Sequence, residues 1–323
     1  MSDRKEWNHV PENLPLEVAP IWRWPLSLPA IFRWYVGSWL PVSINLLFVG
    51  LSFAAYAWAS PTLEQAAVPG LWIAVIWLRN LGLTVLVAQG LHLVFHRYQL
   101  QGTEAKYDPH VYPRKGRGFS FDSQLADNVF WSLASGVTIW SAFEALIWWA
   151  MANGYAPMTT WTAHPVWFVG FFLLLPMWQS FYFYWIHRLL HAKALYLVHA
   201  LHHRNVDVGP WSGLSMHPVE HLLYFGTALI HFVVPSSPVH LICHLMFYGL
   251  YAVTTHTGFE GLWMAGRKRV DLGTFHHQIH HRYFEVNCGT LVVPWDKWFG
   301  TFHDGTEAAK ARMKTRLAAR RRV

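Results

Sequence analysis

The chain has 323 residues, of which 53% are hydrophobic and only 13% are charged. A typical soluble domain carries about 25% charged residues, so this composition excludes an ordinary soluble protein and indicates a membrane protein. The net charge of +7 needs no nucleic acid to explain it, because basic clusters also face membranes, and we expect no nucleic-acid partner. Cys243 and Cys288 are the only cysteines and predict no disulfide framework.

Apolar runs predict the membrane helices, since a helix needs about 17 to 25 apolar residues to cross a bilayer. Four long transmembrane helices are expected at about 37–59, 71–95, 129–151 and 165–186. A fifth apolar region, 222–255, is interrupted by the sequence VVPSSP. We expect it to form a helical hairpin that crosses the membrane only in part.

The distribution of basic residues predicts the orientation of these spans. The segments 60–70, 152–164 and 235–239 contain no Lys or Arg, whereas the segments 97–128 and 187–221 are basic. The positive-inside rule therefore places both termini and the two basic loops in the cytoplasm. The tail KARMKTRLAARRRV is either a solvated helix end or a contact with anionic lipid headgroups.

Two charged residues, Arg79 and Glu144, fall inside predicted spans at similar depths from the outer side. A lone charge in a membrane costs several kcal/mol, on the order of 3. We therefore predict that Arg79 and Glu144 pair. The alternative is that Arg79 extends alone toward the outer surface.

Histidines form the most informative pattern, because 16 of the 21 follow residue 186. His187 and His191 are spaced i, i+4. His199, His202 and His203 follow the spacing i, i+3, i+4, as do His277, His280 and His281. Such offsets place side chains on one face of a helix. The topology puts all three clusters at the cytoplasmic ends of the spans.

Metal binding explains why so many imidazoles would gather there. Neutral imidazole is the commonest metal ligand, whereas a buried imidazole without a partner costs about 1 to 3 kcal/mol. Eight nitrogens are too many for one ion but suit two. Imidazole binds iron, zinc and copper, so the residues alone leave the metal open. A satisfied interfacial histidine is the ordinary interpretation of any one of these residues, but not of three patterned clusters.

The sequence resembles the sterol desaturase/fatty acid hydroxylase superfamily of membrane di-iron oxygenases. The resemblance lies in HRLLH, HALHH and HQIHH, in this order and spacing, and in SMHPVEH, HTGFE and NCGTLVVPWDKWFGT. It covers roughly residues 127–304. Family members usually have Tyr where Cys288 stands, a departure that leaves the ligands untouched.

The resemblance implies a set of iron ligands. They are His187, His191, His199, His202, His203, His256, His277, His280 and His281, with His217 as a further candidate for ligand or supporting residue. His276 is expected to support the ligands. Apart from the resemblance, His92 and His96 repeat the HxxxH spacing at the inner end of the second span; we expect them to end a helix at the interface, and the alternative is a substrate or headgroup contact or an auxiliary ligand. Four more, His221, His231, His240 and His244, are expected to pack or line a pore. Candidate acids that orient the imidazoles are Asp207, Glu220, Asp271 and Glu285.

The resemblance also implies the fold and the function. We expect an all-α integral membrane protein of four long transmembrane helices and a helical hairpin, with a cytoplasmic histidine-rich cap that holds a dimetal site. The expected parts are a cytoplasmic N-terminal segment (1–36), a transmembrane pair with its loop (37–128), a catalytic domain (129–304) and a basic tail (305–323). The segment NCGTLVVPWDKWFG is expected to be non-helical. The expected location is a bacterial inner membrane.

The expected reaction is hydroxylation of a lipid C–H bond by two iron ions (Fe²⁺/Fe³⁺) with O₂ as co-substrate, and desaturation is the alternative. The substrate would be a fatty-acyl chain, a sterol or other isoprenoid, or an aminolipid such as ornithine lipid. Two electrons would come from a separate donor: a ferredoxin, a cytochrome b5-like protein or a reductase. A metal-binding or transport protein without enzymatic activity is the remote alternative; a transporter would place its ligands near the membrane midplane.

Overall fold

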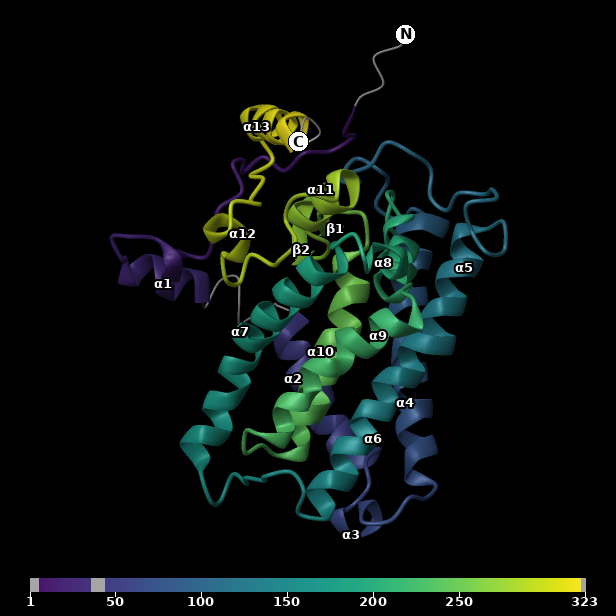
Figure 1. The fold of residues 1–323 in the computed structure, drawn as a ribbon, viewed down its shortest axis with the longest axis vertical. Helices are drawn as coiled ribbons and strands as arrows, with labels where there is room; N and C mark the ends of the chain where they lie inside the picture. Colours follow the sequence, from purple (N-terminus) through teal and green to yellow (C-terminus); the bar gives the residue numbers. More distant parts are fainter. Residues whose placement is uncertain (1–5, 36–43, 321–323) are drawn as a thin grey trace.

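A computed structural model describes residues 6–35 and 44–320 and shows a bundle of long helices (Figure 1). Helix α4 (Trp72–His92) continues as a π-helical turn, η3 (Leu93–Arg97). Helix α5 (Gln124–Trp131) continues through η4 (Ser132–Val137) into α6 (Thr138–Ala152), and α7 spans Pro165–Leu190. Three helical stretches are long and apolar enough to cross a membrane: Trp72–Arg97, Gln124–Ala152 and Pro165–Leu190. They match three of the predicted spans.

The first predicted span, 37–59, is described only in part. Helix α2 (Ile44–Trp58) is apolar and 15 residues long, and residues 36–43 lie outside the described residues. Helix α3 (Leu63–Ala66) follows it and begins with a capping box between Thr62 and Gln65. A fourth long transmembrane helix therefore stays a prediction.

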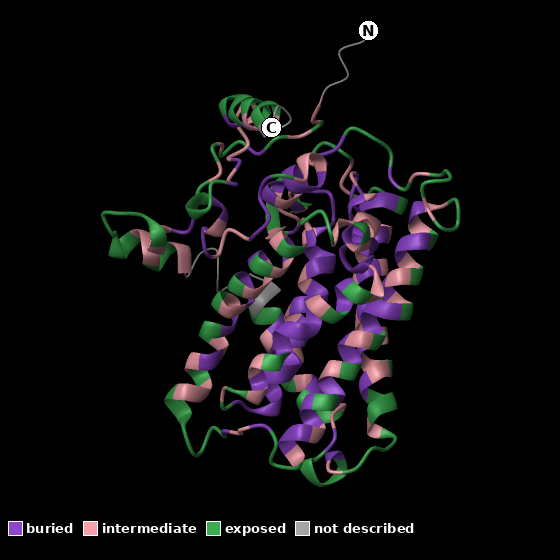
Figure 2. Ribbon diagram, viewed as in Figure 1, coloured by how far each residue is buried: buried purple, intermediate pink, exposed green. Residues whose placement is uncertain are grey.

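Helix α10 (Pro238–Thr255) forms the centre of the bundle. It is the second limb of the predicted hairpin, whose first limb is α9 (Pro218–Phe225) continued by η6 (Gly226–Phe232). Nearly every residue of α10 is buried (Figure 2). Close packing requires a small residue at Gly249, since a Cβ there would lie 2.7 Å from Trp140 Cζ3. The central helix therefore has little freedom to shift.

The histidine-rich end of the bundle carries short elements. They are α8 (Tyr196–His203), η5 (Pro210–Leu214), β1 (Gly261–Met264), β2 (Arg267–Asp271), α11 (Phe275–Tyr283) and α12 (Trp295–Trp298). Strands β1 and β2 pair antiparallel, with Leu262 opposite Val270. The prediction of an all-α fold is wrong in this detail, although the protein is mostly helical. The segment 287–300 is non-helical as expected, apart from α12.

Both ends of the described chain pack against α11. The N-terminal region contains η1 (Pro20–Trp22) and α1 (Leu28–Trp34), and the C-terminal region contains α13 (Glu307–Arg320). Glu6 forms an ion pair with Lys310 of α13 and accepts a hydrogen bond from Tyr283 of α11. Met313 of α13 is buried in a cluster with Ile279. Part of the basic tail thus covers the histidine-rich end, and its contact with lipid stays a prediction.

The predicted pairing of Arg79 with Glu144 is confirmed. Arg79 Nη2 and Glu144 Oε1 form an ion pair whose side chains are 8% and 0% exposed. Asn80 Nδ2 donates to Glu144 Oε2 at 3.2 Å, and Arg79 Nη1 donates to the Ala59 carbonyl at 3.2 Å. These hydrogen bonds satisfy both charges, as a buried pair requires.

Candidate metal centre

Four helices bring nine histidines together. Helix α7 supplies His187 in its last turn and His191 at its C-cap, and α10 is capped by His256. Helices α8 and α11 supply three each: His199, His202 and His203, and His277, His280 and His281. Helix α11 begins where the Thr274 side chain accepts a hydrogen bond from the backbone N–H of His277. The N-cap of α11 therefore holds the backbone of His277, the first histidine of the third cluster.

The nine histidines form two groups. The first group is His187, His191, His199, His203 and His280, and the second group is His202, His256, His277 and His281. Within each group, the candidate ligand atoms lie within 4.8 Å of one another. Each of the two helices α8 and α11 contributes to both groups. His203 and His202 are neighbours in the sequence yet face different groups.

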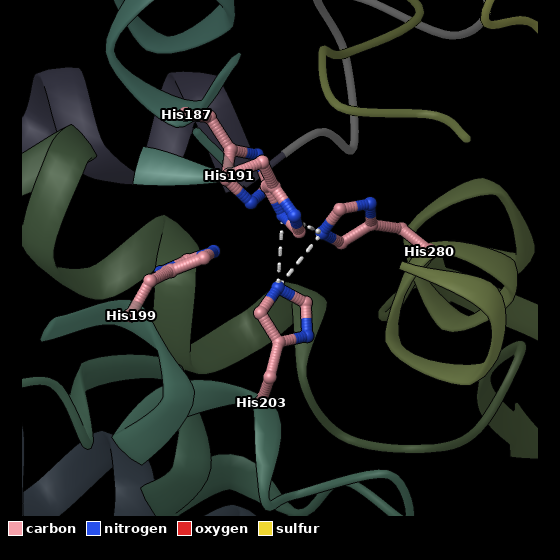
Figure 3. Close-up of side chains that lie close together, drawn as sticks. All are labelled: His187, His191, His199, His203 and His280. Atoms are coloured by element: carbon pink, nitrogen blue, oxygen red, sulfur yellow. Dashed lines mark hydrogen bonds between the residues drawn. The ribbon is translucent and has the colours of Figure 1, made fainter. Parts of the chain in front are cut away.

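In the first group, three imidazoles form a triangle (Figure 3). The Nε2 atom of His191 lies 3.2 Å from that of His280 and 3.1 Å from that of His203. The third side, between His280 and His203, is also 3.1 Å. His187 and His199 point toward the same triangle from α7 and α8 (Figure 3).

The second group repeats this arrangement. The Nε2 atom of His256 lies 3.0 Å from that of His281 and 3.0 Å from that of His277. The distance between His281 Nε2 and His277 Nε2 is 3.1 Å. His202 completes the group, with its ring centroid 4.7 Å from that of His281.

Backbone carbonyls fix the tautomers of several of these imidazoles. His187 Nδ1 lies 2.6 Å from the Cys288 carbonyl, His280 Nδ1 lies 2.7 Å from the Val286 carbonyl, and His256 Nδ1 lies 2.7 Å from the Ala252 carbonyl. A carbonyl only accepts, so each Nδ1 carries the hydrogen. In the neutral ring, Nε2 then presents a lone pair. The lone pairs of His280 and His256 point into their triangles.

Burial keeps these imidazoles neutral. Desolvation lowers the pKa of His199 to about 3 and that of His202 to about 4. It also lowers the pKa of His191 to about 3, with a further contribution from the neighbouring His199. Neutral histidine is the form that binds metal.

The donor set and its geometry fit two metal ions. Two nitrogens bound at right angles to one ion, each at about 2.1 Å, lie about 3.0 Å apart, whereas tetrahedral angles would put them at about 3.4 Å. The observed sides of 3.0 to 3.2 Å are near the first value. Moreover, His199 Nε2 is buried and has no hydrogen-bond partner in the part of the chain that the structure describes, as expected of an atom placed to bind a metal.

Acidic residues around the centre divide into different roles. Glu220 of α9 accepts a hydrogen bond from His199 Nδ1 at 2.7 Å, with both side chains 2% exposed, so this candidate does orient an imidazole. Burial raises the pKa of Glu220 to about 8. Asp207 instead pairs with Lys106, and Asp271 is largely exposed and pairs with Lys268.

Asp296 is a supporting residue that the sequence did not single out. Its carboxylate accepts hydrogen bonds from the backbone N–H groups of Cys288 and Gly289, at 2.8 and 2.7 Å. The Cys288 carbonyl in turn accepts from His187. Asp296 thus holds in place the backbone segment 288–289, whose Cys288 carbonyl orients His187. The signal that could have found Asp296 is its place in the segment NCGTLVVPWDKWFGT, which follows the third histidine cluster.

The remaining candidates lie outside both groups. His217 caps α9, where its Nδ1 accepts from the Val219 N–H at 3.2 Å, so the structure does not bring this predicted site residue to the others. His276 is buried 3.9 Å from Asp296. His96 Nε2 contacts the Thr257 carbonyl at 2.9 Å, next to His256. His231 and His244 hydrogen-bond to each other within the bundle.

A cavity of about 270 Å³ lies between α7 and α10 and reaches both groups. At one end it is lined by His187 and His199 of the first group and by His202, His256 and His277 of the second. Phe183, Met216 and Phe247 give it apolar walls. Both histidine groups therefore face a cavity that has largely apolar walls.

This fold and site are those of a mostly helical protein with three helical stretches apolar enough to cross a membrane and two histidine groups that could each hold a metal ion. Residues 172–301 match the family model described as fatty acid hydroxylase. The matched segment and the sterol desaturase relatives support the resemblance of this chain to the sterol desaturase/fatty acid hydroxylase superfamily. The matched segment lies within the predicted catalytic domain.

Several curated relatives are sterol desaturases. The chain is similar to a Delta(7)-sterol 5(6)-desaturase of Gibberella zeae, 28% identical over 155 residues (46% of this chain and 43% of the relative). It is also similar to a putative Delta(7)-sterol-C5(6)-desaturase 2 of Arabidopsis thaliana, 29% identical over 184 residues (50% and 63%). A Delta(7)-sterol-C5(6)-desaturase of Nicotiana tabacum is 31% identical over 140 residues (42% and 50%). The chain thus spans less than two thirds of these relatives. No solved structure matches it.

Proposed function

We propose that the protein oxidises a C–H bond of a membrane lipid with O₂ at a centre of two iron ions. The observation that carries this proposal is the cavity between α7 and α10, which has apolar walls and is lined by residues of both histidine groups. When bound, the metal pair supplies O₂ reduction and removal of hydrogen from an unactivated carbon. Everything else is the work of the chain's own residues.

These residues hold the metal pair and exclude water. His191, His203 and His280 would hold one ion, with His187 and His199 beside them. His256, His277 and His281 would hold the other, with His202 beside them. Glu220 orients the His199 ring through Nδ1. The apolar walls leave a lipid chain as the natural occupant and keep bulk water from the reacting carbon.

Two outcomes are compatible with this centre. In hydroxylation, one oxygen atom enters the lipid, and O₂ with two electrons and two protons gives the alcohol and one water. In desaturation, the lipid loses two hydrogens, and the same inputs give an alkene and two waters. We propose hydroxylation first, in line with the family model. The names of the relatives favour desaturation as the second candidate.

The electrons, the orientation and the substrate belong to this proposal. We infer a separate electron donor such as a ferredoxin, a cytochrome b5-like protein or a reductase, and a centre on the cytoplasmic side by the positive-inside rule. The bacterial inner membrane expected from the sequence has no support in the comparisons, whose relatives named above are fungal and plant proteins. Iron in preference to zinc rests on the oxidative chemistry of the family.

Lipid analysis tests the proposal. Membranes from cells that express the wild-type chain are compared by mass spectrometry with membranes from cells that express His280→Ala. The wild type should produce a lipid with one added oxygen atom or two fewer hydrogens, only in the presence of O₂, and the variant should not. Identical lipids in both, at equal expression, would contradict the proposal.

A further inference from the structure

Two buried polar groups without partners lie in the cavity, away from the histidines. Gln179 of α7 and Tyr248 of α10 both line it, and they are 4% and 5% exposed. Gln179 Oε1 and the Tyr248 hydroxyl have no hydrogen-bond partner among the described residues. A buried polar group without a partner costs about 1 to 3 kcal/mol, so two in one cavity indicate that a ligand supplies the partner.

The neighbours of these groups fix what each can offer. Gln179 Nε2 donates to the His244 carbonyl at 3.1 Å, which leaves Oε1 as a free acceptor. His244 lies one turn before Tyr248 on α10, so Gln179 contacts α10 one turn from Tyr248. Tyr224 donates to the Tyr248 carbonyl at 2.9 Å, and the Tyr248 hydroxyl remains free to donate and accept. An acceptor and a donor together match a hydroxyl group, whereas a carbonyl or an ether would satisfy only Tyr248.

The helices set the distance from this pair to the metal centre. Gln179 precedes His187 by eight residues on α7, and Tyr248 precedes His256 by eight residues across α10. At 1.5 Å per residue, the backbones of Gln179 and Tyr248 lie about 12 Å before those of His187 and His256 along their helix axes. Two facing helices thus give the same separation independently.

We propose that the cavity recognises a lipid hydroxyl through Gln179 and Tyr248, and that this hydroxyl lies about 12 Å from the carbon that is oxidised. The oxidation of this lipid rests on the proposed function, whereas its binding rests on the cavity alone. The 3-hydroxyl of a sterol is only a few bonds from its C5–C6 bond. A sterol oxidised at that bond could not place its 3-hydroxyl on this pair, so the substrate differs in this respect from those that the relatives' names specify.

Binding of two matched probes tests the recognition without any turnover. The full-length, metal-loaded protein is incubated with equal amounts of hexadecan-1-ol and hexadecane, and the bound fractions are measured by native mass spectrometry. One or two net hydrogen bonds predict a preference for the alcohol of about tenfold. Tyr248→Phe and Gln179→Leu should each reduce this preference by about threefold to tenfold.

Ser180→Ala is the matched control. Ser180 lines the same cavity beside Gln179 but already hydrogen-bonds to Thr290 at 2.9 Å, so its loss should change both probes alike. Tyr248→Phe removes only an unpartnered oxygen and should leave the melting temperature equal or higher. A preference that survives both cavity variants would overturn the proposal, as would a lower melting temperature for Tyr248→Phe, which would reveal a structural role.

Product analysis separates this inference from the proposed function. With O₂ and a reductant, hexadecan-1-ol should be oxidised in the middle of its chain, and Tyr248→Phe should spread the oxidised positions. Hydroxyl-dependent binding without any oxidation would contradict the proposed function alone. Oxidation at unchanged positions in both cavity variants would contradict this inference alone.

Discussion

Glu220 provides a way to perturb one histidine group and leave the other intact. Its Oε1 atom accepts from His199 Nδ1 at 2.7 Å in a fully buried contact, and His199 belongs to the first group only. Removing a partner of this kind from a metal-bound histidine lowers metal affinity by about 10- to 100-fold, or about 1.4 to 2.7 kcal/mol. Glu220→Ala should therefore weaken one of the two sites.

Metal competition measures this effect. The purified protein is titrated with a chelator of known affinity while released metal is counted. Wild type and Glu220→Gln, whose amide oxygen can still accept from His199, should release metal together. Glu220→Ala should release one equivalent at about 10- to 100-fold lower chelator concentration and retain the second. Loss of both equivalents together, or of neither, would refute the assignment of Glu220 to one site.

Three further predictions follow from the same contacts. Glu144→Gln should lower the free energy of unfolding by about 3 to 5 kcal/mol. In chemical unfolding, the double variant Arg79→Met/Glu144→Gln should lose less free energy of unfolding than the two single variants lose in sum. Additive losses would contradict the pairing. Gly213→Ala should be destabilising by about 1 to 3 kcal/mol, because its Cβ would lie 2.2 Å from the Ala252 oxygen, the acceptor for His256; a calorimetric melting temperature like that of the wild type would argue against this packing. Chelator treatment should lower the melting temperature, since nine neutral imidazoles would lose their shared partner, and added ferrous iron should restore it; an unchanged melting temperature would speak against a structural link between metal and fold.

The histidine clusters could be predicted from the sequence because their spacing is a helical repeat. Three i, i+4 pairs, one from each cluster, do share a group in the structure: His187 with His191, His199 with His203, and His277 with His281. The division of the α8 and α11 clusters between the two groups could not be predicted. His202 and His203 point in different directions because adjacent residues of a helix project about 100° apart. The group that each of them joins depends on where α7, α10 and α11 place their own histidines.

The supporting contacts were beyond the reach of sequence reasoning for a physical reason. The carbonyls of Ala252, Val286 and Cys288 orient histidines, and a backbone carbonyl has no residue type. The strands β1 and β2 were missed because they are short and their turn at Ala265 and Gly266, both with positive φ, lies within a basic, mixed stretch. By contrast, Arg79 and Glu144 were predictable since a charge inside an apolar run needs a partner.

Metal stoichiometry tests the central claim most directly. The purified full-length protein, reconstituted with ferrous iron without O₂, is analysed by elemental mass spectrometry and by Mössbauer spectroscopy. Two histidine groups that each hold one ion predict two irons per chain in nitrogen-rich sites. One iron or fewer per chain, after reconstitution of folded protein, would contradict the account.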